Sequence, residues 1–158
     1  MIRCCQNIIP FVLVIFLVDP VHITHPAGRE EYVLSEVGKV YGGSHNRIKG
    51  RPWVYGQMRD SVLPAVCHLL DKYDKLKDAH RGDPVRVVRA ISALVNSNDD
   101  NGVLQGRWDG NYGDGTQPFE WTGSVAILEE YMKNGAKQPV KYGQCWVFAG
   151  VVTTCKCC

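Results

Sequence analysis

The sequence lacks the features that mark several large protein classes. Its 18 basic and 16 acidic side chains leave a formal net charge of only +2, too small a field to attract nucleic acid or an anionic membrane. No internal repeat, sustained heptad pattern or low-complexity tract points to a solenoid or a coiled coil. A length of 158 residues with 45% hydrophobic and 22% charged side chains predicts one globular domain with its own core.

A disulfide scaffold is also not expected. Of the seven cysteines, all but Cys67 and Cys145 gather at the two ends of the chain, which predicts a reduced interior. The final C-x-C-C segment, residues 155–158, carries soft-metal ligands. No nearby histidine or second cysteine pair completes a zinc pattern there.

No apolar run is long enough to span a bilayer, which takes about 20 residues. The run at residues 8–18 fits the core of a secretory signal peptide, although Pro10 interrupts it and no small-residue cleavage site follows. A buried strand and an unusual start site are the alternatives. We expect a cytoplasmic location without membrane association, or secretion if residues 1–20 act as a signal peptide.

The first part of the body predicts extended segments and then helices. Glycines in residues 30–44 favour strands joined by a turn, followed by a basic loop at residues 45–51. Residues 60–76 have the apolar spacing of an amphipathic helix capped by Asp60 or Ser61. In the next segment Asp83 can cap a helix that begins at Pro84, with an apolar face of Val85, Val88, Ile91, Ala93 and Val95.

The loop after this second helix has the chemistry of a calcium site. Asn96, Asn98 and Asp100 place oxygen side chains at alternate positions, and Gly102 lets the chain turn, as at the start of calcium-binding loops. It is not an EF-hand, because the glycine falls at the seventh loop position and Arg107 occupies the twelfth. A plain Asx-turn after a helix is the alternative.

Two further segments carry candidate site residues. In GRWDGNYGDGT, Trp108 stands in a polar turn, where it can close the core or offer its indole N–H to a ligand oxygen.

Ser124 can then cap a third helix that stops at Gly135. In YGQCWVFAGV, the apolar run after Cys145 can form a buried helix or strand. A helix beginning at Cys145 would favour the thiolate through its dipole and free N–H groups. A buried, inert cysteine has a similar sequence.

The segment YGQCWVFAGV resembles the active-site signature of animal transglutaminases. The similarity runs back through WTGSVAILEEY, GRWDGNYGDG, RGDPVRVVRAISALVNSNDDNGVL and EEYVLSEVGKVYGGS, and covers residues 30–154. The resemblance implies an α/β (α+β) fold, namely the α-rich first half of a papain-like core with the nucleophile at a helix N-terminus. Residues 1–29 are then an apolar N-terminal segment and residues 155–158 a divergent cysteine-rich tail.

The same resemblance implies a calcium-dependent acyltransferase. Cys145 matches the nucleophile that attacks a protein glutamine, releases ammonia and forms a thioester, which a lysine or small amine then resolves into an isopeptide or amide. Trp108 matches the indole that stabilises the oxyanion together with the Cys145 backbone N–H. The matching calcium ligands are the side chains of Asn96, Asn98 and Asp100 and the carbonyl of Ala93.

The chain also departs from the family pattern. The family's catalytic histidine and aspartate lie beyond the cysteine motif, and none of the five histidines here stands in a matching position. We therefore expect a truncated core with little activity alone, or a non-catalytic calcium- or protein-binding module. With most of the covering antiparallel sheet absent, we also expect exposed apolar surface on the cysteine helix.

Overall fold

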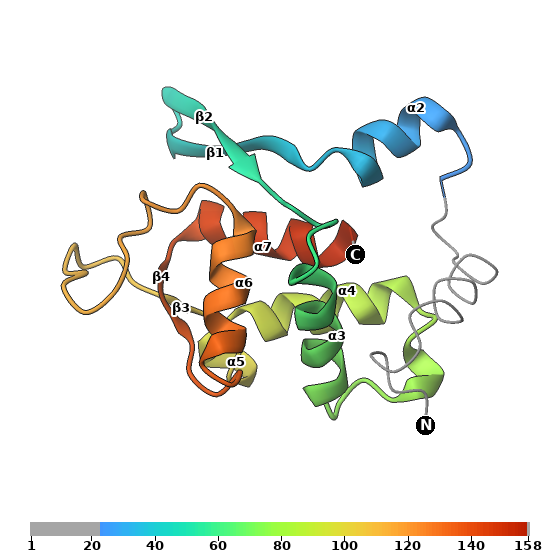
Figure 1. Ribbon diagram of the computed structural model, residues 1–158. Helices are drawn as coiled ribbons and strands as arrows, with labels where there is room; N and C mark the ends of the chain where they lie inside the picture. Colours follow the sequence, from blue (N-terminus) through green and yellow to red (C-terminus); the bar gives the residue numbers. More distant parts are fainter. Residues whose placement is uncertain (1–22, 158) are drawn as a thin grey trace.

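The computed structural model describes residues 23–157, with the side chains of Asp99, Asp100 and Cys157 left out of the description. The apolar segment at residues 8–18 lies outside this part, so its role stays a prediction. Helices and two small sheets form a mixed α/β fold (Figure 1). The first half contains α2 (Pro26–Arg29), η1 (Glu30–Leu34), β1 (Val37–Ser44), β2 (Arg47–Val54), α3 (Val62–Lys72), η2 (Asp78–His80), α4 (Pro84–Val95) and α5 (Ser97–Asp100).

The second half carries the two segments that matter most for the site. It contains β3 (Leu104–Gly106), α6 (Ser124–Lys133), β4 (Val140–Gly143) and α7 (Cys145–Cys157). Strands β3 and β4 pair in parallel, although they are far apart in the sequence. Helix α7 follows β4 almost at once and runs beneath the β1–β2 hairpin, packing against α4 and β1 (Figure 1).

Strands β1 and β2 form an antiparallel hairpin in which Ser44 pairs with Arg47. The predicted basic loop at residues 45–51 is therefore wrong, because most of it belongs to β2. One face of the hairpin buries Val40 and Trp53 at 6% and 0% exposure. Burial of these two side chains fixes the pairing register, while Arg47 and Lys49 remain exposed and Arg51 is half-buried.

The two predicted helices of the first half are present with changed details. Helix α3 begins at Val62, and the Ser61 side chain makes no capping bond to the backbone but donates to Glu129. Helix α4 begins as predicted, with Asp83 accepting from the N–H groups of Val85 and Arg86. Val85 does not join the apolar face but is 58% exposed, because the buried positions begin a turn later, at Ala90, Ile91, Leu94 and Val95.

A fully buried tryptophan joins the hairpin to α6 and α7. The Trp53 indole N–H donates to the hydroxyl of Ser124 at 2.9 Å, and its ring lies against Gly150 of α7. Ser124 was expected to cap α6, but it is the first helical residue and Gly123 holds the N-cap position. Satisfying a buried indole N–H takes precedence there over capping.

Helix α7 is better covered than the sequence indicated. The expected exposed apolar surface on it is not found: among the described side chains, the large apolar ones that are strongly exposed lie elsewhere, for example Tyr41, Ile48 and Phe119. The hairpin covers α7 instead, with Gly42 resting on the Trp146 ring. The helix continues through Thr154, and Cys155 is 2% exposed in the core. Within residues 23–157, no helix has the length and apolarity needed to cross a membrane.

Candidate active site

Cys145 is the first residue of α7. The Gln144 carbonyl accepts hydrogen bonds from the N–H groups of Val147 and Phe148 at 2.8 and 3.1 Å, so the helical pattern begins immediately before the thiol. The thiol therefore stands at the positive end of the helix dipole, where an anion is stabilised. Cys145 is exposed, whereas Cys67 and Cys155 are buried. Cys145 is thus not a buried cysteine, and its role as the nucleophile stays a prediction.

The residues just before Cys145 are bonded to the loop that carries Trp108. The N–H of Arg107 donates to the carbonyl of Gly143 at 3.2 Å. The Gln144 side chain donates to the carbonyl of Arg107 at 3.0 Å and to the hydroxyl of Tyr112 at 2.8 Å. Trp108 and Cys145 are therefore each one residue away from these contacts, and the fold brings their two segments together.

Trp108 does not close the core. Its side chain is 64% exposed, and its six-membered ring lies across Gly106, where an added Cβ would approach two ring carbons to 2.5 Å. The same Cβ would meet the ring of Phe148, in the first turn of α7, at 3.4 Å. The indole thus lies beside the start of α7 and remains accessible to a ligand.

A polar network closes the Trp108 loop. The Arg107 guanidinium contacts carboxylates of Asp109 and Asp114, each at 3.0 Å, and donates to the Tyr142 hydroxyl at 2.6 Å. That hydroxyl donates to Asp114 at 2.7 Å, and Lys141 binds the other carboxylate oxygen at 2.9 Å. Hydrogen bonds from Lys141 and then Tyr142 lower the pKa of Asp114 to about 2. The pKa of Tyr142 is raised, mainly by its bond to Asp114, so the phenol stays protonated.

The candidate calcium loop is a short turn after α4. The Asn96 side chain accepts from the N–H of Asn98 at 3.2 Å, which is the Asx arrangement, and the Ala93 carbonyl accepts from the N–H of Asn96 at 3.1 Å. At Gly102, a Cβ would collide with the carbonyl oxygens of Leu94 and Asn96, so backbone oxygens crowd into this turn. Amide and carbonyl oxygens are the hard ligands that calcium prefers.

The donor set of this loop fits calcium in chemistry. No cluster of three or more His, Cys, Asp or Glu side chains suited to a metal occurs in the described part of the chain. The oxygen groups described in this loop are the Asn96 side chain and the carbonyls of Ala93, Leu94 and Asn96. The side chain of Asp100 is outside the description, and its role as a ligand stays a prediction. A bridge between Asn96 and Leu104 connects the loop to β3, and through it to the Trp108 segment.

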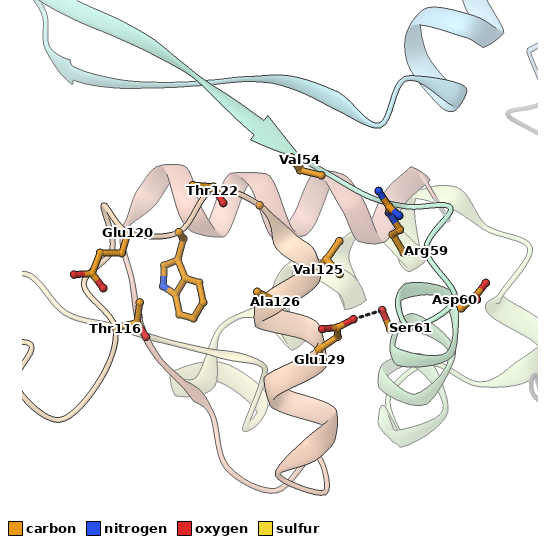
Figure 2. Close-up of a pocket in the computed structure, with 12 residues that line it drawn as sticks. Val54, Arg59, Asp60, Ser61, Thr116, Glu120, Thr122, Val125, Ala126 and Glu129 are labelled. Atoms are coloured by element: carbon orange, nitrogen blue, oxygen red, sulfur yellow. Dashed lines mark hydrogen bonds between the residues drawn. The ribbon is translucent and has the colours of Figure 1, made fainter.

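A separate hollow of about 780 Å³ lies between the end of β2, α3 and α6 (Figure 2). Its lining includes Arg59, Glu120 and Glu129, and the hydrogen bond from Ser61 to Glu129 crosses it. Neither Cys145 nor Trp108 belongs to this lining. This hollow is therefore separate from Cys145 and Trp108.

Known proteins match most of the chain. No protein-family model matches it. The hemocyte protein-glutamine gamma-glutamyltransferase of Tachypleus tridentatus is 54% identical over 136 residues, which are 86% of this chain and 18% of that protein. Human protein-glutamine gamma-glutamyltransferase 5 is 49% identical over 146 residues, 89% of this chain and 20% of its own. The crystal structure of red sea bream transglutaminase matches with a TM-score of 0.79 and 46% identity, over 87% of this chain and 22% of that one.

The chain belongs to the transglutaminase family. It spans about a fifth of the length of the transglutaminases that it matches. The matched fold is the partial α/β transglutaminase core that the sequence motifs predicted.

Several site residues of this transglutaminase chain were not singled out from the sequence. They are Arg107, Asp114, Tyr142 and Gln144, all of which contact the Trp108 loop from within it or from the β4–α7 segment. The available signal was the density of polar side chains in GRWDGNYGDG, which indicates that the turn must satisfy many polar groups locally. Their partners in β4 are about 30 residues away, beyond the reach of any local pattern.

Proposed function

We propose that this chain forms the cysteine side of a transglutaminase acyl-transfer site. Cys145 acts as the nucleophile, and the Trp108 indole N–H acts with the Cys145 backbone N–H as the oxyanion donor pair. The observation that carries the proposal is the exposed thiol at the first residue of α7, held beside the Trp108 loop through Gln144. The acyl donors are proteins bearing glutamine, and the acceptors are protein lysines or small amines.

The proposed reaction has two stages. The Cys145 thiolate attacks the glutamine carboxamide carbon, the amide nitrogen takes up a proton from water, and the C–N bond breaks to release ammonia and leave a thioester. The free amine of a lysine then attacks the thioester carbon, loses a proton and expels the thiolate, giving the isopeptide. In both stages the carbonyl oxygen becomes negative, which is where donors from Trp108 and the helix N-terminus stabilise the transition state.

Reaction with an activated ester measures what Cys145 and Trp108 contribute to acyl transfer. The departure of ammonia from a carboxamide requires a general acid. Cleavage of p-nitrophenyl acetate releases p-nitrophenolate as a stable anion, so that leaving group needs no proton. We expect the purified chain to release a burst of p-nitrophenolate as Cys145 is acetylated. The Cys145→Ala variant measures the background from the other thiols. Because removal of one oxyanion donor costs about 10²–10³-fold, Trp108→Phe should slow the Cys145-dependent burst roughly 100-fold.

This test can fail in two ways. A burst that is equal in the chain and in Cys145→Ala contradicts the nucleophile. A Cys145-dependent burst that Trp108→Phe leaves unchanged contradicts the role of the indole.

We also propose calcium as the cofactor, held by the carbonyl of Ala93 and the side chains of Asn96, Asn98 and Asp100. Bound there, calcium supplies positive charge that orders the turn, and the Asn96–Leu104 bridge links this turn to β3. Titration calorimetry with calcium chloride should give saturable heat for the chain and for the matched control Asn46→Ala, at the exposed hairpin tip. Asn98→Ala should lose that heat, and unchanged binding by Asn98→Ala would refute this site.

A calcium- or protein-binding module without catalysis is the second candidate. The crowded carbonyl oxygens at Gly102 and the Asn96 turn support it, since these oxygen groups lie together without any contribution from the thiol. Calcium heat that depends on Asn98, together with no Cys145-dependent burst, would select this module over the acyltransferase.

We propose a cytoplasmic location. The exposed thiol of Cys145 is free, which suits a reducing compartment. N-terminal sequencing of the mature protein tests this, because a start beyond residue 20 would indicate a cleaved signal peptide and secretion.

A further inference from the structure

We propose that Asp114 is a positioning residue, which acts through Arg107 and Tyr142 to hold the Trp108 indole in place beside Cys145. This inference rests on the acyl-transfer function proposed above. Asp114 does not itself touch the reacting atoms. It sets the geometry of the oxyanion donor from the far end of the loop.

The two ends of the Trp108 loop meet at Tyr142. Arg107 stands just before Trp108 and Asp114 six residues after it, and their side chains pair at 3.0 Å. Both bind the same phenol oxygen of Tyr142, at 2.6 and 2.7 Å, and the guanidinium also lies over the Tyr142 ring at 4.8 Å from its centre. The loop is therefore closed into a ring of contacts that has Tyr142 as an anchor.

That anchor is rigid and lies close to the nucleophile. Tyr142 is 1% exposed, its N–H donates to the Thr116 carbonyl at 3.0 Å, and its carbonyl accepts the indole N–H of Trp121 at 2.9 Å. Only Gly143 and Gln144 separate it from Cys145. A loop tied to Tyr142 is thus tied to the start of α7.

The network positions the Trp108 loop more than it stabilises the folded chain. The Asp114 side chain is 57% exposed and that of Arg107 is 28% exposed, and ion pairs at such positions contribute little to folding. Its effect on the site can still be large, since a displacement of about 1 Å in a catalytic arrangement can cost up to ~100-fold in rate. Loss of Asp114 should therefore disturb acyl transfer while the chain remains folded.

Two reactions of the same thiol test this role. Acetylation by p-nitrophenyl acetate passes through a tetrahedral oxyanion, whereas alkylation by iodoacetamide is a displacement at a CH₂ group and forms no oxyanion. Each rate is measured on the 158-residue chain across pH, with the Cys145→Ala background subtracted. The high-pH plateau then gives the reactivity of the thiolate itself, separately from its ionisation.

Asp114→Asn keeps the shape of the side chain and removes its charge. We expect its acetylation plateau to fall about tenfold while the iodoacetamide plateau is unchanged. Tyr142→Phe, which removes the shared hydroxyl and keeps the ring, should behave in the same way. The control Asp71→Asn breaks a comparable pair, Arg81–Asp71 at 2.7 Å, outside the site and should change neither rate.

Each outcome bears on one claim. If Asp114→Asn lowers both plateaus equally, or neither, the positioning role is wrong. If Trp108→Phe slows acetylation but Asp114→Asn and Tyr142→Phe do not, the proposed function stands and this inference fails. In a Trp108→Phe background, Asp114→Asn should add no further loss, and an additive loss would mean that Asp114 acts by another route.

Discussion

Replacing Gly150 with alanine tests how tightly α7 is packed against the hairpin. Gly150 lies inside the helix, and an added Cβ would meet the Trp53 indole at 2.5 Å from Nε1 and closer still to Cε2. Trp53 is fully buried, and its indole N–H is bonded to Ser124. The ring therefore has no free space into which it can move.

Opposing effects determine how much Gly150→Ala changes the free energy of unfolding. Alanine in place of glycine inside a helix gains about 1 kcal/mol from propensity alone. Overpacking a filled core costs about 1–3 kcal/mol, and straining the buried Trp53–Ser124 hydrogen bond costs about 1 kcal/mol more. The net expectation is a destabilisation of about 2 kcal/mol. For a chain of this length, that corresponds to a Tm lower by roughly 4–8 °C.

Thermal unfolding followed by far-UV circular dichroism measures the effect. The matched control is Gly82→Ala, because no heavy atom lies within 4 Å of the position of its Cβ. That variant should keep the parental Tm or exceed it slightly. If Gly150→Ala also melts at or above the parental Tm, helix propensity dominates and the close packing of Trp53 on α7 is refuted.

Two further predictions follow from the site. Because the folded pKa of Asp114 is lowered to about 2, its carboxylate stabilises the fold above its ordinary pKa of about 4, and this contribution is lost as the pH falls toward 2. Because the pair is exposed, the Tm difference between the parent and Asp114→Asn should be small, constant from about pH 5 upward and lost below about pH 2. A difference that persists at lower pH would contradict the assigned cause. Brief treatment of the native chain with iodoacetamide should label Cys145 before Cys67 or Cys155, since only Cys145 of these three is exposed. Peptide mass spectrometry measures the labelling of each cysteine. Faster labelling of a buried thiol would contradict the packing described above.

The sequence predicted best where local chemistry decides the structure. Asp83 and Pro84 set the start of α4 through capping and a fixed φ, and both act within a few residues. Cys145 was likewise expected at a helix start and lies there. Family motifs added the order of the elements, which a local pattern does not contain.

The failures arise from contacts between distant segments. Ser124 looks like a helix cap from its local sequence. Its hydroxyl instead accepts a hydrogen bond from the indole of Trp53, which is 71 residues away in the chain. The basic run at residues 45–51 reads as a loop, and pairing with β1 makes it a strand. Tyr142 likewise joins Arg107 and Asp114 only because β3 and β4 are neighbours. Polar networks of this kind need the tertiary fold before their members can be recognised.

The pairing of β3 with β4 has a consequence for how this core tolerates changes in length. The two strands run parallel with Leu104 beside Val140, and one leads into the Trp108 loop while the other leads into α7. The pairing already contains one register shift, since Gln105 lies beside Lys141 and Gly106 beside Gly143. Adding or removing a further residue in either strand would shift one segment past the other by about 3.3 Å, more than a hydrogen bond can absorb. Single substitutions on the outer face of the strands leave that spacing unchanged. Among transglutaminases that retain activity, we therefore expect insertions and deletions to accumulate in loops such as residues 73–83 and to be absent between Leu104 and Trp108 and between Val140 and Cys145.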